Sequence, residues 1–97
     1  MIIIPFSTRK LILSHSEATK LDRALSLRNN ESATILVDEW GMEVPVVITK
    51  SAIYFFIPNP TGETRIERVE RLKFTLELAE LLHVKKEGVE TVEEAVV

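Results

Sequence analysis

Three short apolar runs rich in β-branched residues lie close together in the middle of the chain, at residues 33–37, 44–49 and 52–57. Runs of this length that are bounded by polar turn residues are typical of β-strands. The first two are separated by DEWGME, in which Gly41 can adopt the positive φ that a hairpin turn requires. This part of the sequence therefore predicts a β-sheet at the centre of the fold.

The second and third runs also indicate where their strands lie in that sheet. Pro45 cannot donate a hydrogen bond to a neighbouring strand, which predicts that its strand is an edge, or is bulged, at that point. The third run, AIYFFI, shows no polar alternation, so we expect a central strand buried on both faces. The PNPTG that follows it predicts a turn.

Helices are expected on either side of this region. Ser14 and Glu17 have capping-box spacing and precede apolar residues at helical intervals, which predicts a helix over 16–28 that ends at Asn29 and Asn30. Residues 2–6 and 10–13 are apolar enough to form one bent strand or two.

The same capping pattern recurs at Thr64 and Glu67, which predicts a long C-terminal helix from 64 to about 85 or 86. Gly88 is expected to stop that helix, and residues 89–97 to form a short helix or a frayed tail. With 97 residues the chain is expected to form a single α+β domain. We predict an antiparallel or mixed sheet of three to five strands packed against two main helices.

Composition excludes several kinds of chemistry. The chain has no cysteine, which rules out disulfides and thiolate metal sites, and its two histidines are far apart. The net charge of −3 disfavours binding to nucleic acid or to an anionic membrane. Pro5 interrupts the apolar N-terminus and no tract reaches the ~20 residues of a membrane helix, so a cytoplasmic location is expected. The absence of glutamine and the abundance of Glu, Ile and Val are features that thermophilic proteins share.

Three small groups of polar residues have compositions found in functional sites. Glu80 and His83 have the spacing of a di-iron motif, but no second copy of the motif exists. The Ser14-His15-Ser16 sequence brings hydroxyls and an imidazole together without an orienting acid, and is better explained as a helix cap. Asp38 and Glu39 directly precede Trp40 in what we expect to be an ordinary exposed turn. The sequence thus predicts no catalytic, cofactor or metal site.

The long C-terminal helix is expected to carry two apolar stripes. One stripe consists of Val69, Leu72, Leu76 and Ala79, and the other of Phe74, Leu78, Leu81 and Leu82. A helix that docks on one sheet needs a single stripe, so the second requires a further partner. The candidate interface is therefore Phe74, Leu78, Leu81 and Leu82, facing a second subunit. The alternative is that the N-terminal helix covers this stripe within one chain.

These observations favour a non-catalytic interaction or regulatory module, a homodimer joined through the C-terminal helix. The alternative is a DNA-binding regulator, because residues 76–96 resemble a helix-turn-helix and a ridge of arginines could contact phosphates. The arginines of that ridge are Arg65, Arg68 and Arg71. The DNA-binding alternative is disfavoured because the second helix would carry four glutamates, which phosphates repel. These are Glu87, Glu90, Glu93 and Glu94. A third possibility is an enzyme with a pocket that the sequence does not reveal.

Overall fold

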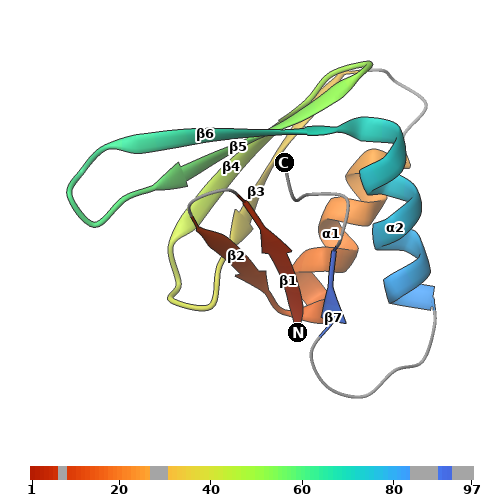
Figure 1. Ribbon diagram of the computed structural model, residues 1–97, viewed down its shortest axis with the longest axis horizontal. Helices are drawn as coiled ribbons and strands as arrows, with labels where there is room; N and C mark the ends of the chain where they lie inside the picture. The colour runs from red at the N-terminus through yellow and green to blue at the C-terminus, as the bar shows by residue number, and fades with distance from the viewer. Residues whose placement is uncertain (7–8, 27–30, 84–89, 93–97) are drawn as a thin grey trace.

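Seven strands and two helices make up the part of the chain that the computed structural model describes, residues 1–6, 9–26, 31–83 and 90–92 (Figure 1). In chain order they are β1 (Ile2–Pro5), β2 (Lys10–Leu13), α1 (His15–Leu25), β3 (Ser32–Val37), β4 (Glu43–Ile48), β5 (Ala52–Pro58), β6 (Thr64–Glu70), α2 (Arg71–His83) and β7 (Glu90–Thr91). The α+β class predicted from the sequence is confirmed.

The strands form two sheets. The larger is antiparallel throughout, in the order β3-β4-β5-β6, and the smaller has the order β2-β1-β7, with β7 parallel to β1. The β1–β2 hairpin, α1 and α2 all lie on the same side of the larger sheet (Figure 1). Among the described residues, no helix or strand covers the opposite face of that sheet. Residues 2–6 and 10–13 therefore contribute to two strands of a hairpin, rather than to one bent strand.

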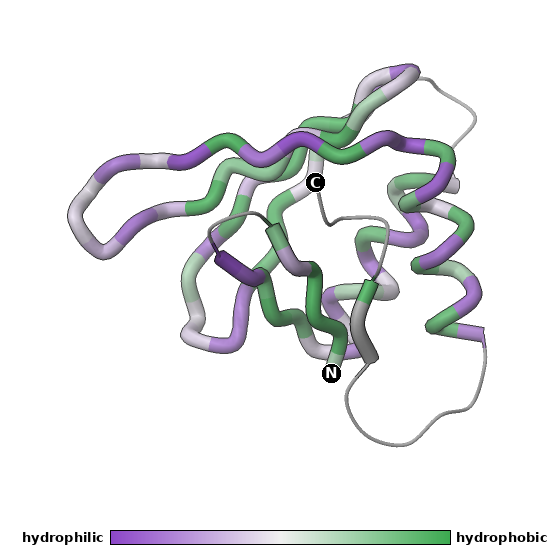
Figure 2. Tube along the Cα trace, in the orientation of Figure 1, coloured by the Kyte–Doolittle hydropathy of each residue, from purple (hydrophilic) through white to green (hydrophobic). Residues whose placement is uncertain are grey.

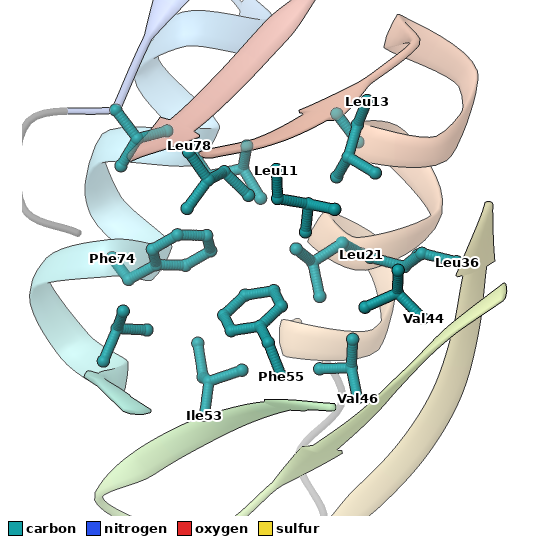
Figure 3. Close-up of a cluster of buried hydrophobic side chains, with 14 of the residues drawn as sticks. Leu11, Leu13, Leu21, Leu36, Val44, Val46, Ile53, Phe55, Phe74 and Leu78 are labelled. Carbon is teal, nitrogen blue, oxygen red and sulfur yellow. The ribbon is translucent and has the colours of Figure 1, made fainter. Parts of the chain in front are cut away.

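The core lies between the larger sheet and the elements on its covered side (Figure 3). Phe55 of β5 is at its centre, with its ring centroid 5.4 Å from that of Phe6 and 5.7 Å from that of Phe74 on α2. Both ring pairs are tilted, the arrangement that aromatic quadrupoles prefer. Among the described residues, no polar or charged residue is buried, so hydrophobic burial dominates the packing.

Helix α1 begins at His15, one residue before the predicted start, with Ser14 as its N-cap as the capping box predicted. The Ser14 hydroxyl accepts a hydrogen bond from the Glu17 amide at 3.2 Å, and Ala18, Leu21 and Leu25 face the core. The helix ends at Leu25, three residues before the predicted end. Asn29 and Asn30, the predicted stop signals, lie outside the described residues.

The predicted start of the C-terminal helix is wrong. Residues 64–70 form strand β6, which pairs with β5 along its whole length, and α2 begins only at Arg71. Most of β6 is hydrophilic (Figure 2), and its two apolar residues, Ile66 and Val69, are three positions apart and so lie on opposite faces of the strand, with Val69 buried and Ile66 57% exposed. Thr64 and Glu67 are therefore strand residues that cap no helix. Pairing with β5 outweighs the helix propensity of the Glu and Arg residues in this segment.

Strand β5 is central in the larger sheet, as predicted, but it is not buried on both faces. Ile53, Phe55 and Ile57 are buried, whereas Tyr54 and Phe56 are only half-buried. The lack of polar alternation therefore indicates a sheet whose open face is also apolar.

Arg71 connects three elements at the point where β6 passes into α2. Its guanidinium donates to the Thr49 carbonyl at 2.9 Å and to the Leu25 carbonyl at 3.2 Å. Its backbone amide donates to the Ser51 carbonyl at 3.0 Å. Arg71 thus ties the β4–β5 turn to the C-terminal end of α1, where a positive charge is also favoured by the helix dipole.

Candidate functional site

The larger sheet divides into two hairpins at one end. Strands β4 and β5 pair only from Val46 to Ile48 and from Ile53 to Phe55, although β3–β4 and β5–β6 pairing continues well beyond. The β3–β4 and β5–β6 hairpins therefore diverge past Val46 (Figure 1). The divergence creates space that an evenly paired sheet would not have.

Pro45 provides a physical reason for the division. On β3, the Ile35 carbonyl accepts from Lys20 Nζ at 2.6 Å, and the Val37 amide donates to Glu17 Oε2 at 3.2 Å. These backbone groups point away from β4, so Ile35 and Pro45, which lie opposite each other, form a non-hydrogen-bonded pair. The nitrogen of Pro45 then points towards β5, where it has no hydrogen to donate. Strand β4 is interior in the sheet, so the expected edge is found only locally: at Pro45 the strand pairs with β3 and not with β5.

A groove of about 670 Å³ opens between the diverging hairpins and strand β2. We call it the Trp40 groove. It is lined by Arg9, Lys10, Leu11, Ile12, Asp38, Trp40, Met42, Ile57, Pro58 and Pro60. Seven of these ten side chains are apolar, and the volume falls within the range of small-molecule sites in proteins.

Trp40 is held at the groove by a closely hydrogen-bonded turn. The Asp38 carboxylate accepts from the backbone amides of Trp40 at 2.9 Å and Met42 at 2.8 Å. Gly41, with φ of +79°, allows the chain to reverse, and the Glu39 amide donates to the Ile12 carbonyl of β2 at 3.0 Å. The turn is thus fixed both internally and to β2, while the Trp40 side chain is 73% exposed.

The charges of the groove favour an anion at the end formed by β2. Arg9 and the exposed Lys10 contribute two cations, and Arg9 Nη1 donates to the Pro58 carbonyl at 3.4 Å. The guanidinium has five N–H donors, so it can bind a further acceptor. The one carboxylate that lines the groove, Asp38, is held by the amides of the turn.

The sequence identified only part of this site. Trp40 lies in an exposed turn, as expected, beside Asp38 and Glu39. The contributions of β2 and of residues 57–60 were missed, because no local pattern relates segments that are separated by 15 or more positions. Pro45 was the one usable signal, since a proline in a strand predicts where pairing fails.

The residues of the expected interface have a different role. Phe74 and Leu78 are fully buried in the core of the single chain, and Leu81 and Leu82 pack against it partly buried. Helix α2 directs this stripe towards α1 and β5, so the alternative considered for it, coverage within one chain, is correct.

Only Leu72 and Leu76 of the other apolar stripe face solvent, because Val69 is a buried residue of β6 and Ala79 is half-buried. Leu72 is 66% exposed and Leu76 is 63% exposed, so the two faces of the helix were assigned the wrong way round. The helical period places residues on a common face, but only the tertiary packing decides which face is covered.

The arginine ridge does not exist. Arg65 and Arg68 lie on strand β6, where residues three apart point to opposite faces, and Arg71 is engaged with Thr49 and Leu25. These three side chains therefore cannot form one phosphate-binding row.

The helix-turn-helix alternative also loses its second helix, because β7 occupies Glu90 and Thr91. The further glutamates expected on that helix, Glu87, Glu93 and Glu94, lie outside the described residues.

The remaining polar candidates lie at the surface. Glu80 and His83 are exposed on α2, and His15 is exposed at the start of α1, with its Nδ1 2.9 Å from the amino nitrogen of Met1. Within the described ranges, no three His, Asp or Glu residues gather where they could hold a metal ion. Neither α1 nor α2 has the length and apolar character that a membrane crossing requires.

The chain was compared with models of protein families, with curated proteins and with solved structures. None of the three comparisons gave a match.

Proposed function

We propose that this protein is a non-catalytic interaction module that binds an amphipathic ligand in the Trp40 groove. The ligand we infer has an aromatic or aliphatic body and one anionic group. A cytoplasmic location, expected from the sequence, is part of the proposal. The observation that carries it is an exposed tryptophan held by a fixed turn beside an apolar groove.

The lining of the groove supports this ligand class. Trp40 and Met42 offer an aromatic and a polarizable surface, and exposed tryptophans on preorganised turns are common anchors of binding energy. The anionic group would lie near Arg9 and Lys10, which are adjacent in the sequence and both line the groove.

The same lining favours binding over catalysis. No His, Ser, Thr or Tyr is among the described residues that line the groove, and Asp38 is occupied by the turn. A nucleophile or general base would need a partner within hydrogen-bonding distance. The groove offers shape and charge without such a pair.

The experiment uses anilinonaphthalene sulfonate, whose aromatic body and sulfonate match the inferred chemistry. Trp40 is the only tryptophan of the chain, so its fluorescence reports directly on the groove. We expect saturable quenching of Trp40 emission at micromolar probe, with one site per chain by calorimetry.

Variants assign the binding to the groove. Trp40→Ala should weaken the calorimetric affinity by about 30-fold, the effect of a 2 kcal/mol anchor. Arg9→Ala should weaken it about two- to fivefold, because a charge at a solvated rim contributes little. Leu72→Ala, on the exposed face of α2, is the matched control and should bind as the wild type does. Equal affinity for the wild type and Trp40→Ala, or no quenching at all, would contradict the proposal.

A further inference from the structure

The outer edge of β2 forms one wall of the Trp40 groove. Strand β2 is an edge strand of the smaller sheet, where it pairs with β1 on one side only. Lys10, Leu11 and Ile12 all line the groove, although successive side chains of a strand point to opposite faces. This is expected where a strand presents its edge. The groove therefore has main-chain as well as side-chain surface.

The pairing of the β1–β2 hairpin identifies the backbone groups on this edge. The Phe6 amide donates to the Arg9 carbonyl at 2.6 Å, which makes these residues a hydrogen-bonded pair. Hydrogen-bonded and non-hydrogen-bonded pairs alternate along an antiparallel hairpin, so the amides and carbonyls of Lys10 and Ile12 point away from β1. The Glu39 amide confirms this assignment, because it donates to the Ile12 carbonyl from outside the hairpin.

Three of these four backbone groups are left without a partner. Within the described ranges, the backbone amide of Lys10, its carbonyl and the amide of Ile12 make no hydrogen bond. The edge of β3 differs, because Lys20 and Glu17 of α1 bind its outward carbonyl and amide. The fold thus closes that edge with a helix and leaves the edge of β2 open to an apolar groove.

We propose that the ligand of the Trp40 groove is an extended peptide segment that adds a strand to the outer edge of β2. This inference rests on the ligand binding proposed above and names the class of that ligand. The unpaired groups of Lys10 and Ile12 would pair with the main chain of the segment, the mode of recognition known as β-strand addition. Their donors and acceptor lie at strand spacing and match the main chain of a peptide, which a small amphipathic molecule lacks.

The side chains beside the edge select a segment that is both acidic and apolar. Lys10 is exposed on the face of β2 that is turned away from the core, whereas Leu11 is buried on the core face. Opposite charges on neighbouring strands stabilise pairing, so acidic side chains are expected beside Lys10. Side chains on the other face of the segment would point towards Met42 and Ile57, in the apolar lining. The segment we infer therefore alternates acidic and apolar residues.

A second copy of this chain is disfavoured at this edge. Two β2 edges that paired with each other would bring Arg9 and Lys10 of one copy close to those of the other, and like charges on neighbouring strands repel. A lysine on an edge strand is a common protection against such self-pairing. The partner is therefore a chain of opposite charge.

The experiment uses a synthetic peptide of about six residues, the usual length of a strand, in which glutamate alternates with valine and phenylalanine. The peptide is blocked at both ends and carries a fluorescein label. We expect saturable binding in the micromolar range by fluorescence anisotropy, and displacement of anilinonaphthalene sulfonate from the groove. The same peptide with lysine in place of glutamate should bind at least about tenfold more weakly, because like charges then meet.

Methylation of the peptide amides tests the pairing directly. Alternate amides of an extended segment face β2, so N-methyl groups on the glutamates remove one set of donors and N-methyl groups on the apolar residues remove the other. One of these two peptides should bind at least about tenfold more weakly than the unmodified peptide, and the other within about twofold of it. The two have the same composition and charge, so each is the control for the other.

Ile12→Pro removes one donor from the edge of the protein. The Ile12 amide points away from β1, so the hairpin loses no hydrogen bond, and proline is tolerated on an edge strand. The variant should bind the peptide about fivefold more weakly and anilinonaphthalene sulfonate within about twofold of the wild type, with an unchanged circular dichroism spectrum. Leu72→Ala, on the exposed face of α2, should bind the peptide as the wild type does.

The two probes separate this inference from the proposed function. Binding of the sulfonate without binding of the peptide overturns strand addition and leaves the groove as a site for small amphipathic molecules. Equal effects of the two methylated peptides also overturn it, because binding would then not depend on which amides face β2. They decide the question even if Ile12→Pro does not fold. If neither probe binds, the proposed function fails and this inference fails with it.

Discussion

Arg71 shows how much one side chain can organise in a small fold. Its guanidinium satisfies carbonyls of Thr49 and Leu25, which belong to segments far apart in the sequence. We predict that Arg71→Met lowers the free energy of unfolding by about 1.5–3 kcal/mol, because methionine keeps the apolar stem and loses charged hydrogen bonds. Chemical denaturation measures this, with Lys73→Met, an exposed change on the same helix, as the control. A loss no larger than that of Lys73→Met would show that water replaces these bonds at no cost.

Pro45 has its effect at the scale of the strand. We predict that Pro45→Val extends the pairing of β4 with β5 by restoring an amide that can donate to β5. The new hydrogen bond should raise the free energy of unfolding by up to about 1 kcal/mol and narrow the Trp40 groove. Binding of anilinonaphthalene sulfonate should weaken as stability rises. If stability rises and binding is unchanged, the divergence of the hairpins has another cause.

The elements also show where sequence patterns succeed and fail. Strands β3, β4 and β5 and the start of α1 were predictable because turn residues and a capping hydroxyl are local signals. Strand β6 was not, because TRIERVE has capping-box spacing and good helix formers, and only its partner β5 makes it a strand. Local preference there was outweighed by pairing between segments, which no single window of sequence contains.

At the scale of the whole molecule, the α+β class followed from the sequence but the site did not. The Trp40 groove needs β2, the β3–β4 turn and the end of β5 in one place, and that arrangement depends on how hairpins pack. The stripe of Phe74 and Leu78 was recognised as apolar and needing a cover. This stripe could be covered by a second chain or by α1 and β5 of the same chain. The choice depends on side-chain volumes and on distances between elements, which the periodicity of the sequence does not contain.

Strand β7 has a consequence for the order of folding. It pairs with β1 through Ile2 and Glu90, which lie 88 positions apart, and Val92 next to it is fully buried. Closing a loop of that length costs about 4 kcal/mol of chain entropy. The pairing of two strand residues offsets little of this cost until the rest of the core has formed. We therefore expect β7 to dock last and open first. Hydrogen exchange measures this order. The Val92 amide, which donates to the Ile3 carbonyl at 2.9 Å, should exchange well before the amides that pair β4 with β5. Equal protection of these amides would mean that the chain opens only as one unit.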